Sequence, residues 1–291
     1  MHHPLSNRIF AFLTASLLLL SCAVSAQGLS SGAACIDEKA VTALLDGTVF
    51  FGESTTAHLA RRGGVLDTPA WRRHVWRDAG GTRMLDRRLL ATGVLYEENG
   101  VTASLSVADA LAREQPARIL LSFGLNGLTA HAKDPARFLS TYRFFLDRIR
   151  EISPNTKIYL QSVYPVGENT VFSENVATLN RYIRSLNASL SAACDAWGDA
   201  TFLDMSGVLL DADGALARAF DAGDGIHLTN EAYLKILTVL SEHLGAPTSN
   251  ERIYEYEKNH DFPACSDPPS LCLRPALPRG SVDLRHLRGL P

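Results

Sequence analysis

Short, mostly apolar runs alternate with amphipathic stretches over most of the chain. Residues 48–51 and 117–123 are rich in apolar and β-branched side chains, and each run is followed by a glycine, which is typical of buried parallel strands. Two further strands are expected at residues 157–163 and 200–205. After Asp134-Pro135, apolar residues recur at helical spacing, which predicts a long amphipathic helix.

Other helices are predicted from the same periodicity and from residues that commonly cap helices. They cover residues 37–45 and 106–113 and begin again after Ser173 and Thr229. Residues 71–76 fit either a helix or an extended segment. Glu97-Glu98-Asn99-Gly100 is expected to form the tip of a hairpin, because Asn-Gly accepts positive φ angles.

The alternation of strands and helices with short connections predicts an α/β protein with a parallel sheet and helices on both faces. Right-handed crossovers would place the carboxyl ends of all strands along one edge, where ligands bind in open α/β sheets. Ser54 and Asn126 each follow a predicted strand. The topology is therefore expected to bring them together.

Both ends of the chain differ in composition from the middle. Arg8, an apolar run at residues 9–20 and small residues at 24–26 predict a signal peptide over residues 1–26 that is removed on export. An alternative is a lipoprotein signal in which Cys22 carries the lipid. We expect a globular domain over residues 27–248, and a poorly ordered tail rich in proline and arginine over residues 249–291.

Composition narrows the classes of function. The chain has 291 residues, a net charge of −3 and interspersed charges, so no nucleic-acid surface is expected. No segment of the expected mature chain is long and apolar enough to span a membrane, so no transmembrane segment is expected. After removal of the signal peptide, four cysteines would remain: Cys35, Cys194, Cys265 and Cys272. Their pairing stays open. Their spacing matches no zinc pattern. No cofactor is expected.

Three separate fragments carry residue types that acyl transfer requires. Ser54 in Gly52-Glu53-Ser54-Thr55-Thr56 is a candidate nucleophile, and the His227 of Asp224-Gly225-Ile226-His227 is a candidate base with Asp224 as its orienter. The Asn126 amide could donate a hydrogen bond to an oxyanion. Each fragment alone also fits an ordinary role, as a helix cap, a surface ion pair or a turn. His58 has no carboxylate at suitable spacing and is expected to pack or to face the substrate.

Together and in this order, the fragments resemble the three motif blocks of the SGNH (GDSL-type) hydrolase family, over roughly residues 45–245. The resemblance implies a three-layer α/β/α fold of flavodoxin-like type, with a Ser54, His227 and Asp224 triad and no metal. It also implies an oxyanion hole made by the Ser54 N–H, a glycine N–H and Asn126. Gly81 is the preferred glycine, over Gly93 and Gly100. Glu53 departs from the family, which usually has aspartate there.

The resulting expectation is an exported serine esterase that acts on small-molecule or glycan esters, most plausibly with short acyl groups such as O-acetyl. Two alternatives remain: an acyltransferase that uses the same site, and a non-catalytic envelope or glycan-binding protein on the same fold. The sequence leaves open the acyl length, the alcohol portion, the oligomeric state and the role of the tail.

Overall fold

The computed structural model describes residues 38–78, 84–98 and 101–244, and of residues 96–98 and 101 it describes only the backbone. The predicted signal peptide, the lipid attachment at Cys22, Gly81, the domain boundary at residue 248 and the tail lie outside the described residues. So do Cys35, Cys265 and Cys272. Cys194 is a buried free thiol.

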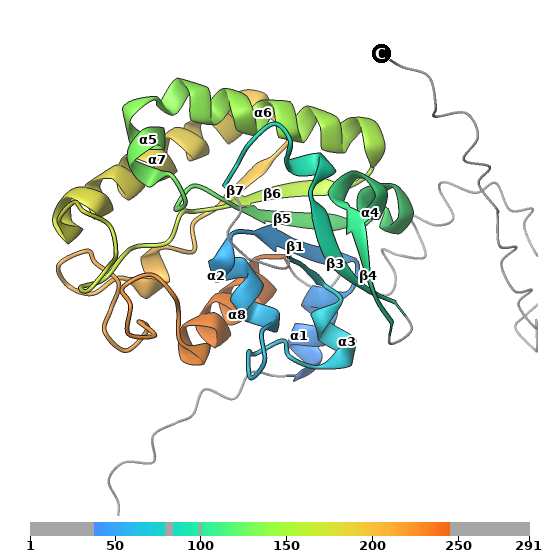
Figure 1. The fold of residues 1–291 in the computed structure, drawn as a ribbon, viewed down its shortest axis with the longest axis horizontal. Coiled ribbons are helices and arrows are strands. Elements are labelled where there is room, and N and C mark those ends of the chain that lie inside the picture. The colour runs from blue at the N-terminus through green and yellow to red at the C-terminus, as the bar shows by residue number, and fades with distance from the viewer. Residues whose placement is uncertain (1–37, 79–83, 99–100, 245–291) are drawn as a thin grey trace, which may run out of the picture. The chain divides into compact units, whose positions relative to one another are not determined.

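A parallel five-stranded sheet forms the centre of the described fold (Figure 1). Its strands are β1 (Thr48–Gly52), β2 (Val75–Trp76), β5 (Arg118–Ser122), β6 (Lys157–Gln161) and β7 (Thr201–Leu203), in the spatial order β2-β1-β5-β6-β7. Counted within the sheet alone, this is the order 2-1-3-4-5 of flavodoxin-like folds. The predicted α/β class and flavodoxin-like sheet are confirmed.

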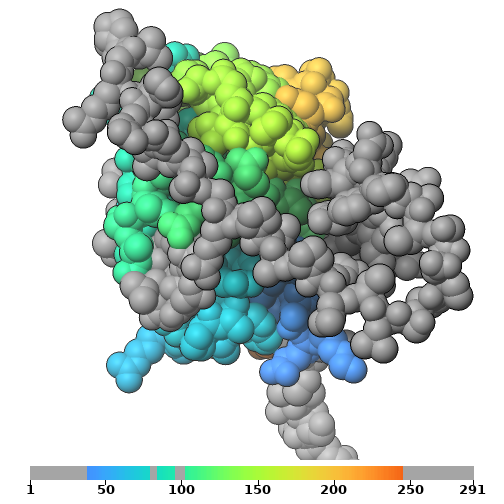
Figure 2. Space-filling view, turned by 90° about the vertical axis from the view of Figure 1, so that its right-hand side faces the viewer, coloured from blue at the N-terminus to red at the C-terminus, as the bar shows by residue number. Residues whose placement is uncertain are grey.

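Helices cover both faces of the sheet and make three layers. Strand β1 shows the two faces, because Val49 and Phe51 join one buried cluster and Phe50 joins the other. The first cluster contains the apolar residues of α4 (Val107–Glu114), α6 (Pro135–Ile152) and α7 (Val176–Trp197). The second contains those of α1 (Glu38–Leu45) and α8 (Asn230–Leu244). Figures 1 and 2 both show α6 and α1 on opposite sides of the molecule.

Smaller elements connect this framework. The short helical segments are α2 (Ser54–Ala57), η1 (His58–Ala60), α3 (Pro69–Arg72), η2 (Leu89–Ala91), α5 (Leu128–Lys133) and η3 (Gly207–Leu209). Strands β3 (Gly93–Glu98) and β4 (Val101–Ser106) pair antiparallel, as the predicted hairpin requires. Among the described helices, none combines the length and the apolar character that crossing a membrane would need.

Two details differ from the sequence prediction. Helix α7 begins later than expected, because Asn175 and not Ser173 is its cap, and the Asn175 side chain accepts a hydrogen bond from the Thr178 N–H. Residues 71–76 contain both predicted conformations, since α3 ends at Arg72 and the edge strand β2 follows at Val75. A strand of two residues is too short to show a period.

Candidate active site

Ser54 lies two residues after the carboxyl end of β1, an interior strand of the sheet. The turn requires glycine at position 52, because a Cβ there would stand 2.5 Å from the Ser122 carbonyl oxygen and 2.3 Å from the Thr56 hydroxyl. Ser54 then begins α2, and the Tyr233 hydroxyl of α8 donates to the Thr55 carbonyl at 2.6 Å. The serine is thus held between a central strand and a helix of the second layer.

His227 and Asp224 lie in the loop before α8. Gly225 makes this loop possible, because it has a φ of +71° and a Cβ there would stand 2.5 Å from the Glu168 carbonyl oxygen. The Gly167 N–H donates to the Gly225 carbonyl at 2.8 Å. The loop is therefore fastened to the segment that follows β6.

The structure brings these three side chains into one hydrogen-bonded row. The His227 Nε2 lies 3.0 Å from the Ser54 Oγ, and the His227 Nδ1 lies 2.6 Å from the Asp224 Oδ2. The second Asp224 oxygen accepts the backbone N–H groups of His227 and Ile226, at 2.8 and 3.0 Å. A hydroxyl from the beginning of the fold and an imidazole from its end therefore share one proton path.

The electrostatics favour an ionised Asp224 beside the ring. Burial by itself would raise the pKa of this carboxyl, but the hydrogen bonds from the His227 ring and from the N–H groups of His227 and Ile226 lower it to about 2. An ionised acceptor at Nδ1 favours the tautomer that carries its proton there. Nε2 is then free to accept a proton from Ser54.

Asn126 follows β5, the strand that pairs with β1. Its loop is tied to the Ser54 turn by the buried side chain of Glu53. One Glu53 oxygen accepts the Gly124 N–H at 2.9 Å, and the other accepts those of Leu125 and Asn126, both at 3.0 Å. The residue before the candidate nucleophile therefore sets the position of the candidate oxyanion donor.

Glu53 is 2% exposed, and burial raises its pKa to about 8 against the opposing effect of the three N–H donors. Sequence reasoning treated this position only as a departure that could affect loop geometry. The contact with residues 124–126 spans two strands and has no local sequence signal. The family's usual aspartate was the only hint that a carboxylate is needed there.

His58 is a second residue of the site whose contact sequence reasoning did not identify. It lies in η1, four positions after Ser54, and its ring stacks on that of His227 with centroids 4.2 Å apart and an angle of 30° between the planes. The ring is half-buried. It belongs to the surroundings of the candidate base.

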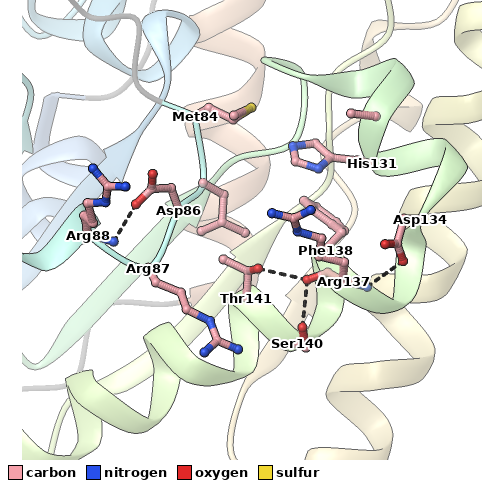
Figure 3. A pocket seen from close by; sticks show the side chains of 12 residues that line it. Met84, Asp86, Arg87, Arg88, His131, Asp134, Arg137, Phe138, Ser140 and Thr141 are labelled. Carbon is pink, nitrogen blue, oxygen red and sulfur yellow. Dashed lines mark hydrogen bonds between the residues drawn. The ribbon is translucent and has the colours of Figure 1, made fainter.

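A pocket of about 680 Å³ adjoins the Asn126 loop (Figure 3). Residues 84–88 form one side, and α5 and α6 form the other. His131 lines it with Nε2 3.1 Å from the Asn126 carbonyl oxygen, and its ring packs against Phe138 at 4.6 Å. Ser54, Asn126 and His227 do not line this pocket, and His131 connects it to the Asn126 loop.

The other predicted site residues can be placed only in part. Gly93 begins β3, whereas Gly81 and Gly100 lie outside the described residues, so the predicted glycine donor stays a prediction. Within residues 38–78, 84–98 and 101–244, no group of three or more histidine, cysteine, aspartate or glutamate side chains could hold a metal ion.

Residues 50–235 match the family model described as GDSL-like Lipase/Acylhydrolase, which is more than half of the chain and confirms the resemblance of the three fragments. The search of curated proteins returned no match.

Solved structures with a similar backbone include a GDSL-like lipase from Bacteroides thetaiotaomicron VPI-5482, with 18% identity, 68% of this chain and 86% of that chain covered, and a TM-score of 0.48. A peptidoglycan O-acetylesterase has 12% identity, 70% and 92% coverage and a TM-score of 0.43. The OSK domain of Drosophila Oskar has 13% identity, 70% and 96% coverage and a TM-score of 0.42. Because these values are low, the family assignment rests on the match over residues 50–235.

Proposed function

The chain belongs to the GDSL-like lipase/acylhydrolase family and is an ester-bond hydrolase, and on that premise we propose that it works as a serine esterase with Ser54 as nucleophile. His227 is the general base and Asp224 its orienter. The observation that carries this proposal is the unbroken row Ser54 Oγ, His227 Nε2, His227 Nδ1 and Asp224 Oδ2, with steps of 3.0 and 2.6 Å.

The chemistry follows from this row. His227 Nε2 takes the Ser54 proton while Oγ bonds to the ester carbonyl carbon, and the imidazolium then gives that proton to the departing alcohol as the C–O bond breaks. The acyl group remains on Ser54. Water then loses a proton to His227 as it bonds to the same carbonyl carbon, and the proton returns to Ser54 when the acid leaves. Asp224 stays ionised throughout and stabilises the imidazolium.

We further propose an oxyanion hole made by the Ser54 N–H, the Asn126 side-chain amide and the Gly81 N–H. Support for the first two comes from the neighbouring strands β1 and β5 and from the Glu53 carboxylate that joins their ends. Such donors are worth about 3–4 kcal/mol each in comparable sites when they face the developing charge.

The proposed substrates are small or glycan esters with short acyl groups, such as O-acetyl. The support is the expected export of the chain, which would give it access to extracellular or envelope carbohydrate. A panel of p-nitrophenyl esters of graded length and of acetylated sugars tests this proposal. The best rates on long acyl chains would contradict it, and acyl groups recovered on an added sugar would identify a transferase.

Export itself is proposed from the sequence of residues 1–26. Expression of the full chain in a secreting bacterial host, followed by mass spectrometry of the product, gives the mature terminus. A chain that begins at Gln27 supports a cleaved signal peptide. A lipid on Cys22 supports the anchored alternative, and an uncleaved cytoplasmic chain contradicts both.

Replacement of the nucleophile tests the central claim. Ser54→Ala should lower the turnover of p-nitrophenyl acetate by ~10⁴-fold or more, because no other hydroxyl contacts Nε2 among the described residues. It should also abolish labelling by a fluorophosphonate probe. The matched control is Ser185→Ala on the exposed face of α7, which should keep both.

Circular dichroism would establish that both variants are folded. Full activity of folded Ser54→Ala would exclude the proposed mechanism.

A further inference from the structure

The hydrogen bonds of His227 leave one of its movements unrestrained. Contacts to Ser54 and Asp224 lie at the edge of the ring, at Nε2 and Nδ1. They oppose movement within the plane of the ring much more than tilting about the line that joins the two nitrogens. A contact with the flat face is needed to hold the plane itself.

His58 supplies such a contact. Its ring lies over that of His227 as a stacked pair, with a centroid separation of 4.2 Å and a tilt of 30°. It follows Ser54 by four positions through α2 and η1, so the same turn that carries the candidate nucleophile also carries the stacking ring. The backbone between them is helical and short.

The surroundings of His58 keep it uncharged. Its pKa is lowered to about 4, mainly by burial and also by repulsion from His227 and Arg61, while Asp224 acts in the opposite direction. Its Nδ1 is buried without a hydrogen-bond partner among the described residues, so a proton there would gain no acceptor. A neutral ring can lie against an imidazolium, whereas a second cation would oppose its formation.

We propose that His58 is a positioning residue, whose neutral ring stacks on His227 and holds the imidazole plane in line with both Ser54 and Asp224. The inference rests on the proposed role of His227 as the base. His58 itself exchanges no proton with the substrate. Its contribution is to the geometry of the proton path and to the stability of the charged intermediate form of His227.

The experiment compares a substitution that keeps the flat ring with two that remove it. His58→Phe retains an aromatic face and removes both nitrogens, so kcat on p-nitrophenyl acetate should stay within about twofold of the wild type. His58→Gln and His58→Leu remove the ring and should lower kcat by about 3- to 10-fold with KM unchanged. Labelling of Ser54 by the fluorophosphonate probe should slow in parallel.

Two ring-free variants are used because one of them alone could fail to fold. The His58 side chain is half-buried, so the polar glutamine is compatible with its exposed part and the apolar leucine with its buried part. Near-ultraviolet circular dichroism establishes that each variant is folded. Wild-type kcat in folded His58→Gln or His58→Leu would overturn the inference. An equal loss in His58→Phe would overturn it too, because the nitrogens and not the stacked face would then matter.

Failure of the proposed function has a different signature. A wild-type protein that neither hydrolyses the ester nor reacts with the probe would overturn the triad and this inference together. A wild-type protein that does both, with rates indifferent to residue 58, would overturn this inference alone.

Discussion

The Glu53 carboxylate joins the two loops that carry Ser54 and Asn126. It accepts three consecutive backbone N–H groups, from residues 124–126, and its own N–H donates to the Ser122 carbonyl at 3.1 Å. Buried N–H groups without acceptors are costly, so a single carboxylate stabilises a whole turn. Ser54 and Asn126 therefore depend on one side chain for their relative position.

Replacing Glu53 by glutamine should damage both stability and turnover. An amide offers one acceptor oxygen and turns two N–H donors toward a site that already contains three, so at least one backbone N–H loses its partner. The expected cost is about 1–3 kcal/mol of unfolding free energy, measured by urea denaturation. Turnover should fall by about 10-fold or more, because the Asn126 loop shifts.

The control for this variant is Glu242→Gln, an exposed glutamate near the end of α8. Glu53→Asp keeps two acceptor oxygens and should lose less than the glutamine variant. Wild-type stability and turnover in Glu53→Gln would show that the three hydrogen bonds do not hold the loop.

From the sequence, residues could be proposed for the site where a motif carries the chemistry, and not where a contact is only spatial. Ser54, Asp224 and His227 could be proposed as nucleophile, orienter and base because these are recognisable residue types at recognisable places. The structure brings their side chains together, and their roles stay a prediction. The stacking of His58 could not be named, because it depends on how the loop before α8 returns to the turn after β1.

Helix α7 supports the site through two buried asparagines. Asn187 exchanges two hydrogen bonds with the backbone of Val163, at 2.8 and 3.0 Å, and Asn180 does the same with Val166, at 3.0 and 2.8 Å. These bonds fix the backbone of the segment after β6, next to Gly167. The Gly167 N–H in turn donates a hydrogen bond to the Gly225 carbonyl in the loop that carries His227. The apolar periodicity of the sequence predicted this helix. The segment after β6, however, is held by two polar side chains on the buried face of the helix.

Asn180→Ala should loosen the loop that carries His227. The Val166 N–H would lose the Asn180 acceptor, and the Val166 carbonyl would lose one of its two donors, the other being the Leu216 N–H, in a place where Asn180 is 3% exposed. The expected loss is about 1–3 kcal/mol of unfolding free energy. Turnover should fall while Ser54 stays in place. Ser189→Ala removes a hydroxyl that bonds only within its own helix, to the Ser185 carbonyl, and serves as the control.

Hydrogen exchange of the Gly167 amide provides the direct measurement for this pair of variants. Faster exchange is expected in Asn180→Ala and not in Ser189→Ala. Unchanged protection in both would mean that the loop is held by other contacts.

At the scale of the whole molecule, topology explains why separated fragments meet. The strand order reverses direction between β1 and β5, and ligands of open α/β sheets bind outside the carboxyl ends at such a point. Ser54 and Asn126 follow these two strands. Alternating strands and helices were enough to predict this edge. The edge strand β2 and the six-residue helix α5 were not predictable, because each is shorter than the period that would reveal it.

Each buried histidine should destabilise the folded protein in mild acid. The pKa values of His58, His74 and His131 are all lowered, mainly by burial, so the unfolded chain binds protons that the folded chain does not. For His58 this stability is present above about pH 6.5 and is lost as the pH falls toward about 4. Asp224 adds a further loss as the pH falls from 3.8 toward about 2.

Glu53 acts in the opposite direction. Its pKa is raised to about 8, so the stability that it contributes is present below 4.5 and declines as the pH rises toward 8. Between pH 8 and 4.5 the Glu53 contribution therefore opposes that of the histidines, so the test compares two proteins and not one midpoint. As the pH falls from 6.5 toward 4, the urea midpoint of the wild type should fall relative to that of His58→Phe. An equal pH dependence in the two proteins would contradict the assignment of a buried neutral His58.

The distance in sequence between Ser54 and His227 has a consequence for biosynthesis. A nascent polypeptide that has emerged only as far as α7 already contains Ser54, but His227 and Asp224 have still to follow. On the proposed mechanism, such an intermediate is chemically silent toward esters. Competence then arrives only when the loop before α8 docks beside β1, so activity itself reports the completion of folding.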